Sequence, residues 1–230
     1  MKLNWGIMDW LKEKMPSLSR GAVIGLDIGE QTIKLIQVET KDQTIQLNKL
    51  AILETPLGVV EEGELRQVNE LAQKLSLVLK ENDFTGPRVV GAISGENVIT
   101  RTIEVPSMPP EELDDTVKWE AEDQIRLPIE KATIDYEILS RQPEGGYKLL
   151  LVAVKRELVN KYLTLFESLD LLPAGIETEP MALGRLIKNL HIDKTICIID
   201  VGLQTTDISV LDRGQLLFTR TINMGGSDIT

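Results

Sequence analysis

Two short segments of this chain carry the same set of carboxylate, glycine, amide and hydroxyl residues, 173 positions apart. Residues 23–35 read VIGLDIGEQTIKL and residues 196–208 read ICIIDVGLQTTDI. Aligned, they share Asp27 with Asp200, Gly29 with Gly202, Gln31 with Gln204 and Thr32 with Thr205. Each segment is an apolar run, a polar turn and a second β-prone run, which predicts a β-hairpin with a tight turn. Because glycine lets a ligand approach the backbone, two such turns facing each other predict a clamp for a phosphate chain and its metal ion.

The residue types in these turns suit the phosphates of a nucleoside triphosphate. Carboxylates hold Mg²⁺ directly or through its waters, which is the role expected of Asp27 and Asp200. Free backbone amides and amide or hydroxyl side chains donate to phosphate oxygens, and a lysine adds positive charge. The ATP-binding set predicted on these grounds is Asp27, Gly29, Gln31, Thr32, Lys34, Asp200, Gly202, Gln204, Thr205 and Thr206.

Two glutamates bear on the same chemistry. Glu179 stands at the start of a predicted helix between the hairpins, where its carboxylate could position a water for attack on the γ-phosphate. Glu30 lies inside the first turn and would repel a phosphate unless its side chain points away. The sequence leaves open whether ATP is hydrolysed or only held.

The composition narrows the class of protein. The net charge is −11 and no run of basic residues is present, so a nucleic acid is not expected as a partner. The sequence has one cysteine, Cys197, and one histidine, His191, which excludes a disulfide framework and a Cys- or His-rich metal site. This usage fits a reducing, cytoplasmic setting.

No apolar stretch approaches the roughly 20 residues that span a bilayer. Residues 1–21, with Trp5 and Trp10, predict an amphipathic arm that packs on the domain or touches a membrane surface or a partner.

The apolar patterns predict the elements that must position the turns. Around the first turn these are three strands, a helix and a further strand, at 22–27, 32–38, 44–53, about 64–81 and 89–93. A strand, a helix, two strands and a helix follow at 98–105, 110–126, 132–140, 147–154 and 156–169. A strand at 174–177 and a helix at 179–189 lead to the second hairpin and to a third strand at 215–222. This order is typical of a layered α/β fold.

The predicted division of the chain follows the changes in character. Residues 22–95 and 173–190 are expected to form a first lobe, and residues 96–172 an inserted α+β subdomain for interactions. Residues 191–230 are expected to begin a second lobe. Fewer elements follow the second hairpin than the first, so this lobe is expected to be truncated.

These motifs resemble those of actin, sugar kinases and DnaK-type chaperones, which share an actin-like (ribonuclease H-like) ATPase fold. Residues 27–34 are similar to the first phosphate motif of that superfamily, 177–183 to its connecting helix and 200–206 to its second phosphate motif. Within it the chain most resembles the PilM family of type IV pilus assembly. The most specific stretch is WEAEDQIRLPIE at 119–130, because the wider superfamily does not share it. It lies in the insert, which is similar to a subdomain of FtsA and PilM.

The resemblance implies an actin-like adaptor that binds ATP and Mg²⁺, with hydrolysis slow or absent. It further implies a groove between insert and first lobe that holds the cytoplasmic tail of PilN, an inner-membrane protein. Such a protein lies in the cytoplasm at the inner membrane, contacts motor or platform proteins, self-associates, and serves pilus biogenesis and twitching motility. The family's glycine-rich adenosine loop is expected beyond residue 230, so this chain alone is expected to bind ATP poorly.

Two alternatives stay open at this point. One is an FtsA-like cell-division protein that polymerises and docks on a membrane. The other is a sugar or acetate kinase of the same superfamily, which is disfavoured because residues 96–172 lack an evident sugar-binding set.

Overall fold

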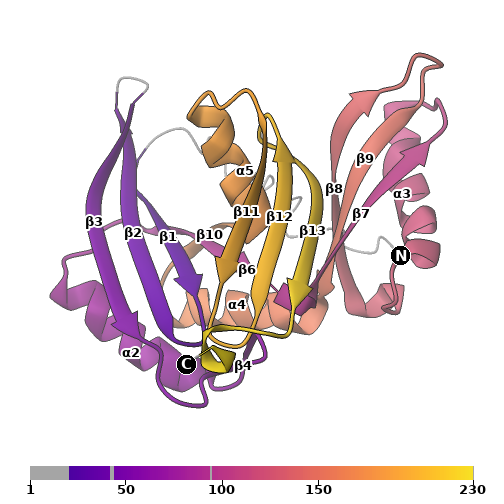
Figure 1. Cartoon of the computed structure of the whole chain (residues 1–230). Helices are drawn as coiled ribbons and strands as arrows, with labels where there is room; N and C mark the ends of the chain where they lie inside the picture. Colours follow the sequence, from indigo (N-terminus) through magenta and orange to yellow (C-terminus); the bar gives the residue numbers. More distant parts are fainter. Residues whose placement is uncertain (1–20, 42–43, 94, 230) are drawn as a thin grey trace.

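The computed structural model describes residues 21–41, 44–93 and 95–229. One side of the molecule is a five-stranded sheet of order β10-β6-β1-β2-β3 (Figure 1). Its strands are β1 (Val23–Ile28), β2 (Thr32–Lys41), β3 (Thr44–Glu54), β6 (Arg88–Ile93) and β10 (Leu172–Thr178). Side chains of β1 and of the first half of β2 alternate in burial, because one face of these strands packs into a core.

Two helices cover that face of the sheet. They are α2 (Val68–Glu81) and α4 (Arg156–Ser168), and both place leucines at helical spacing on one side. Leu71 and Leu75 of α2 meet Leu165 and Phe166 of α4 in the same buried cluster. The predicted division counts α4 with the insert, whereas its buried side chains join the core of the first sheet. The lobe boundaries stay a prediction, and this packing favours grouping α4 with the first sheet.

The insert forms the opposite side of the molecule. Its sheet has the order β7-β9-β8, with strands β7 (Val98–Val105), β8 (Ala132–Arg141) and β9 (Tyr147–Lys155). Helix α3 (Pro110–Gln124) packs on this sheet through Leu113, Val117 and Ala121. A proline at the first helical position suits the start of α3, and the helix ends ahead of Pro128.

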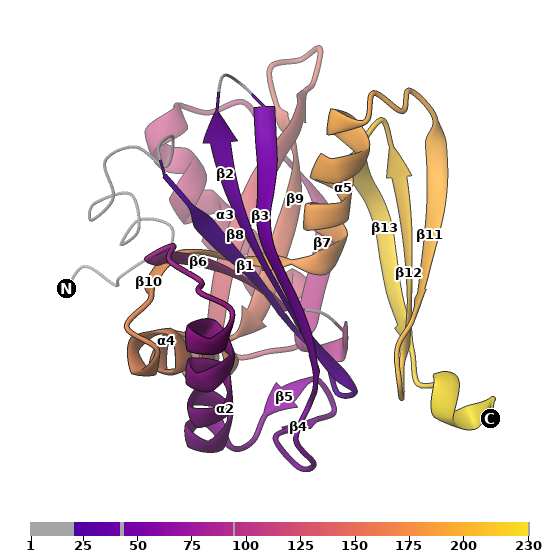
Figure 2. The ribbon, with the colours of Figure 1, turned by 90° about the vertical axis from the view of Figure 1, so that its left-hand side faces the viewer.

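The second hairpin belongs to a third sheet, of order β11-β12-β13. Its strands are β11 (Thr195–Val201), β12 (Thr206–Asp212) and β13 (Gln215–Ile222). Helix α5 (Glu179–Asn189) stands between this sheet and the first one (Figure 2). A small buried cluster of Leu150, Leu211 and Leu216 joins the third sheet to the insert.

Most predicted elements are confirmed, with shifts at their ends. The helix predicted from about residue 64 begins at Val68, because β5 (Glu64–Leu65) pairs with β4 (Val60–Glu61). The strand predicted at 174–177 is longer as β10, with a register shift between Pro173 and Gly175. The described residues also form short 3₁₀ helices, which are η1 (Gly95–Asn97), η2 (Ile129–Lys131) and η3 (Gly226–Asp228). The predicted arm at 1–21 lies outside the described residues, apart from Gly21.

Candidate functional site

The two predicted turns have the same geometry. In the first, the Gly29 amide donates to the Thr32 carbonyl at 3.0 Å; in the second, the Gly202 amide donates to the Thr205 carbonyl at 2.8 Å. A Cβ added to either glycine would lie 3.0 or 3.1 Å from that same carbonyl oxygen. A side chain at either glycine would therefore press on its own turn. The repeat seen in the sequence is also a repeat of structure.

Each turn is braced from the segment that follows the third strand of its sheet. After β3, the Thr55 hydroxyl donates to the Gly29 carbonyl at 2.6 Å. After β13, the Gly226 amide donates to the Gly202 carbonyl at 2.9 Å. These two hydrogen bonds were not predictable from the repeat, because a side chain makes the bond in one copy and the backbone makes it in the other.

The two turns line one cleft of about 350 Å³. All of the predicted ATP-binding residues except Thr206 line it, and so does Glu179: Asp27, Gly29, Gln31, Thr32, Lys34, Asp200, Gly202, Gln204 and Thr205. The Thr206 hydroxyl donates instead to the Met224 carbonyl at 2.7 Å, so this residue holds the hairpin together. The structure thus gathers residues from both ends of the chain into a single place.

Tyr162 of α4 and Ala92 of β6 add to the cleft lining, and the sequence linked neither to the site. The Tyr162 hydroxyl donates to the Ala92 carbonyl at 2.9 Å. Burial, and to a smaller extent the charges of Glu179 and Asp27, raises the pKa of the Tyr162 hydroxyl well above its usual range. The phenol therefore stays protonated and keeps this hydrogen bond.

Lys34 holds a positive charge at the cleft. Its Nζ lies 2.9 Å from Oδ2 of Asp27, the residue opposite it on β1. The hydrogen bond to Asp27, and the charges of Asp27, Asp200 and Glu179, raise the pKa of the Lys34 ammonium against the opposing effect of burial. Both partners are substantially exposed, so the pair contributes little to stability and serves mainly to orient the lysine.

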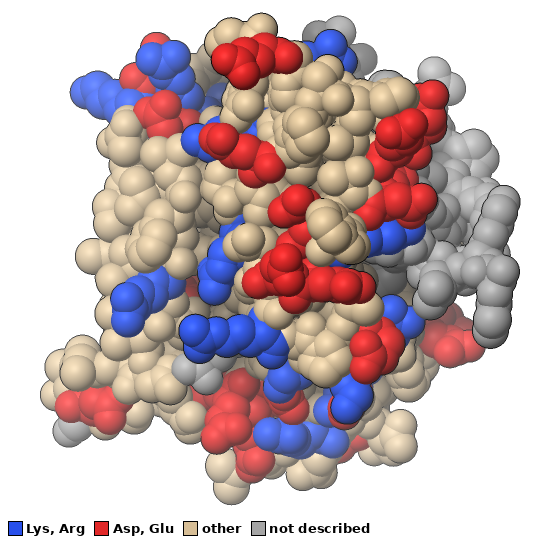
Figure 3. Space-filling view, turned by 90° about the vertical axis from the view of Figure 1, so that its right-hand side faces the viewer, with Lys and Arg blue, Asp and Glu red and all other residues tan. Residues whose placement is uncertain are grey.

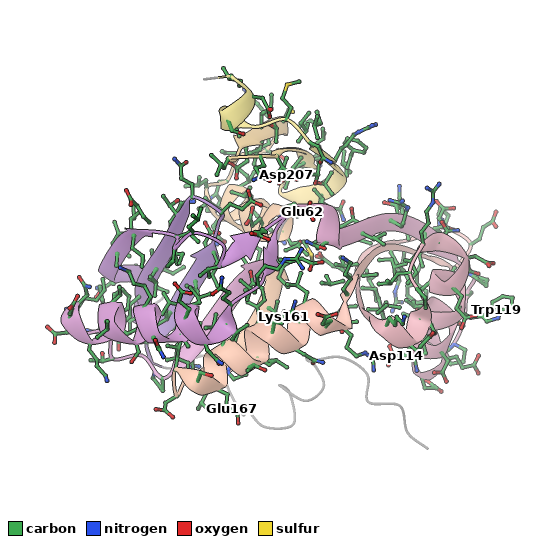
Figure 4. All side chains as sticks on the ribbon, turned by 90° about the horizontal axis from the view of Figure 1, so that it is seen from below. Glu62, Asp114, Trp119, Lys161, Glu167 and Asp207 are labelled. Carbon is green, nitrogen blue, oxygen red and sulfur yellow. The ribbon has the colours of Figure 1, made fainter. Side chains whose placement is uncertain are left out.

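Asp207 also lines the cleft, although it was not among the residues predicted from the sequence. It lies opposite Asp200 on the neighbouring strand, as Lys34 lies opposite Asp27 in the first hairpin. Figure 4 labels Asp207 on the third sheet and Glu62 on the segment between β4 and β5, and both line the same cleft. The alignment of the two repeats could have found Asp207, because it falls on the position that Lys34 occupies.

Replacing Asp207 by Asn is expected to stabilise the protein at neutral pH. Burial, and then the charge of Asp200, raises the pKa of the Asp207 carboxyl, while the hydrogen bond from Thr221 opposes the change. The unfolded chain therefore ionises first as pH rises past the ordinary value of 3.8, and the wild-type fold loses stability above that pH. Asn carries no such cost, so the difference in unfolding free energy should vanish in acid and be largest near neutrality.

Urea unfolding across this pH range measures the effect, with Asp212→Asn as the matched control. Asp212 lies on the same strand, and its partners across the sheet are the uncharged Thr195 and Gln215. A pH-dependent gap of the same size in both variants would contradict the explanation.

The Glu30 side chain lies at the cleft, although a phosphate site would favour a carboxylate that points away from it. Its Oε1 accepts the amide of Gly63 at 3.2 Å, and both residues line the cleft. Its Oε2 is buried without a hydrogen-bond partner among the described residues. The carboxylate thus ties the first turn to the segment between β4 and β5, and its negative charge stays beside the site.

The carboxylates of the cleft suit a magnesium ion that arrives with a phosphate. Within residues 21–41, 44–93 and 95–229, no group of three or more His, Cys, Asp or Glu side chains could hold a metal ion alone. Mg²⁺ usually keeps several waters and takes one or two carboxylates together with substrate phosphate oxygens. Asp27 and Asp200, on facing hairpins that line one cleft, fit that donor set.

A second, smaller pocket lies where the insert meets the first sheet. Its volume is about 70 Å³ and most of its lining is apolar, with Ile93, Thr133, Ile134, Asp135, Val152, Val154, Val159, Ile176, Glu177 and Thr178 at its walls. Three consecutive residues come from β8 and three from β10. In the described part of the chain each of these is the edge strand of its sheet. We refer to this pocket as the edge groove.

The insert presents an acidic face (Figure 3). Exposed carboxylates of α3 contribute to it: Glu111, Glu112, Asp114, Asp115, Glu122 and Asp123. Among them Trp119 is 72% exposed and projects outward (Figure 4). A field of this sign repels nucleic acid phosphates. None of the helices in the described ranges is long and apolar enough to cross a membrane.

Solved structures that match this chain include a PilM chain with a high structural similarity. A chain of the "PilM-PilN type IV pilus biogenesis complex" is 30% identical, with a TM-score of 0.81 over 91% of this chain and 63% of the other. This chain thus spans somewhat under two thirds of that PilM-PilN chain. The cytoplasmic domain of EpsL, an inner-membrane component of the type II secretion system of Vibrio cholerae, shares the fold at 11% identity. Its TM-score is 0.55, over 88% of this chain and 71% of EpsL.

The ethanolamine utilization protein EutJ from Carboxydothermus hydrogenoformans also shares the fold, at 16% identity and a TM-score of 0.50. That match covers 94% of this chain and 56% of EutJ. The sequence model of the type IV pilus assembly protein PilM matches residues 25–230, which include both turns, the cleft and the edge groove. The fold is the actin-like ATPase fold, and the chain belongs to the PilM family of type IV pilus assembly proteins.

Proposed function

We propose that this chain is a nucleotide-binding adaptor of the type IV pilus assembly platform at the inner membrane. It holds the cytoplasmic tail of a PilN-like membrane protein in the edge groove. The observation that carries the proposal is this groove itself, an apolar pocket walled by β8 of the insert and β10 of the first sheet. Family membership favours this function over the FtsA-like and kinase alternatives.

The edge groove has the features of a peptide site. An edge strand carries backbone amides and carbonyls with no partner on one side, and an extended peptide can pair with them. Apolar side chains of the peptide then enter the pocket, which Ile134, Val152 and Ile176 help to line. A tail peptide of a PilN-like protein supplies both kinds of contact.

The cleft between the turns serves ATP in this proposal. Mg²⁺, when bound with the nucleotide, neutralises phosphate charge and is held through Asp27 and Asp200, directly or through water. Lys34 donates to the phosphates, and amides of the two glycine turns donate to the remaining oxygens. Glu179 positions a water for attack on the γ-phosphate. Hydrolysis is slow or absent, because the carboxylates of Glu30 and Asp207 line the cleft and repel the negative charge of the phosphates.

The adaptor lies in the cytoplasm, peripheral at the inner membrane, where its partner's tail emerges. Its further partners are motor or platform proteins and other copies of itself. The exposed acidic face of α3 is free of the cleft and of the edge groove, so it leaves a surface for such contacts.

The test is binding of a fluorescein-labelled synthetic peptide with the sequence of a PilN cytoplasmic tail, measured by fluorescence anisotropy without nucleotide. The wild-type chain should bind it. Thr133→Trp adds a large side chain at the β8 wall of the groove and should raise the Kd at least about tenfold, because it fills space that the peptide needs.

Thr102→Trp is the matched control. Thr102 lies on β7 of the same sheet, is exposed and does not line the edge groove. The proposal fails if wild type gives no anisotropy change, or if both tryptophan variants bind the peptide as tightly as wild type.

A further inference from the structure

Thr178 stands at the wall of the edge groove with a hydroxyl that is buried and lacks a hydrogen-bond partner within the described residues. Only 5% of the residue is exposed. A hydroxyl taken out of water without a partner costs free energy, so buried hydroxyls in folded proteins are nearly always paired. The lone hydroxyl at this position therefore requires a reason.

Capping of helix α5 does not supply that reason. Thr178 directly precedes the first turn of α5, where a threonine oxygen usually accepts a helix amide. Its backbone has φ −90° and ψ 140°, which suits a cap, but its side chain makes no capping hydrogen bond. Thr178 is thus a residue type that commonly caps helices, but its hydroxyl accepts no amide of α5.

The two carboxylates of the groove already have partners. Glu177 is ion-paired with Arg185 of α5, and Asp135 accepts the amide of Tyr136. The hydroxyl of Thr178 is thus a polar group of the groove wall that the described chain leaves available, next to the apolar Ile93 and Ile176.

We propose that the Thr178 hydroxyl is a specificity determinant of the edge groove, which hydrogen-bonds the main chain of an extended peptide lying between β8 and β10. The inference rests on the proposed function, because it assigns a role within the same groove. Apolar walls alone accept aliphatic side chains in several registers. A single buried hydroxyl removes some of these placements, because it is satisfied only where a main-chain amide or carbonyl of the peptide faces it.

Thr178→Val and Thr178→Ser test this role with the same labelled PilN tail peptide. Val keeps the branched shape and removes the hydroxyl, whereas Ser keeps the hydroxyl and removes a methyl. We expect Val to raise the peptide Kd about fivefold and Ser to leave it within about twofold of wild type. Val should also raise the midpoint of thermal unfolding of the free protein, because it removes an unpaired buried hydroxyl.

A set of peptides, each with one backbone amide replaced by an ester, identifies the bonded position. One replacement should weaken binding to wild type and have no added effect with Thr178→Val. If wild type binds the peptide and Thr178→Val binds it equally well, this inference is overturned while the proposed function stands. If wild type itself fails to bind, the proposed function falls and this inference falls with it.

Discussion

In the full-length protein, replacing Asp200 by Asn should lower the affinity for Mg²⁺-ATP at least about tenfold and remove the dependence of binding on Mg²⁺. Asn keeps the shape of the side chain and removes the charge that we propose orients the metal ion. The same change in Asp27, on the facing turn, should have the same effect, because both side chains line one cleft. Calorimetric titration with ATP, with and without Mg²⁺, measures both quantities.

The stability of the Asp200 variant separates a lost ligand from a damaged fold. Asp200 and Asp207 are partners across neighbouring strands, and like charges in that position repel. Asp200→Asn should therefore unfold at a higher temperature than wild type while it binds Mg²⁺-ATP more weakly. Asp212→Asn, at the other end of β12 and outside the cleft, should leave binding unchanged. Unchanged Mg²⁺-dependent affinity in both the Asp27 and Asp200 variants would remove the cleft as a nucleotide site.

Local sequence was sufficient for the two turns because their signal is local. A glycine, an aspartate and short polar side chains between two β-prone runs specify a tight hairpin. The repeat of that pattern predicted that both turns serve one site, and Asp27 and Asp200 do line one cleft. The strands and helices were predicted for the same reason, since alternation and helical spacing are read within a few residues.

Features that depend on contacts between distant elements were not predictable in this way. Tyr162 lines the cleft because α4 returns from the insert to pack under the first sheet. The helix at 156–169 was predicted, but its apolar pattern does not tell which sheet it packs on. The edge groove exists because β8 and β10 are both edge strands, which is a property of strand order. The unpaired hydroxyl of Thr178 was not predictable either, because a threonine directly before a helix ordinarily indicates a cap.

The cleft and the edge groove share a wall. Ala92 lines the cleft and Ile93 lines the groove, from successive positions of β6. Thr178 and Glu179 are divided in the same way at the junction of β10 with α5. The position of α5 therefore bears on both sites, and what holds α5 in place matters for the function of each.

Helix α5 is fixed to the third sheet by a contact between two glycines. Gly184 lies in the middle of α5, and Gly214 lies in the turn between β12 and β13. A Cβ added at Gly184 would come within 2.6 Å of the Gly214 carbonyl oxygen and 3.0 Å of the buried Leu211 side chain. Backbone cannot move aside as the end of a flexible side chain can, so α5 and the hairpin would have to separate.

Gly184→Ala should therefore destabilise the protein by about 2 kcal/mol, although alanine favours a helix by about 1 kcal/mol over glycine. It should also weaken Mg²⁺-ATP binding, because the hairpin that carries Asp200 is displaced from the one that carries Asp27. Gly175→Ala on β10 is the matched control, since no atom lies within 4 Å of the Cβ it would add. Chemical denaturation and ATP titration of both variants measure the two effects.

Equal stability of the two alanine variants would mean that the glycine contact does not set the distance between the turns. A destabilised Gly184 variant with wild-type ATP affinity would mean that the cleft tolerates movement of its second half.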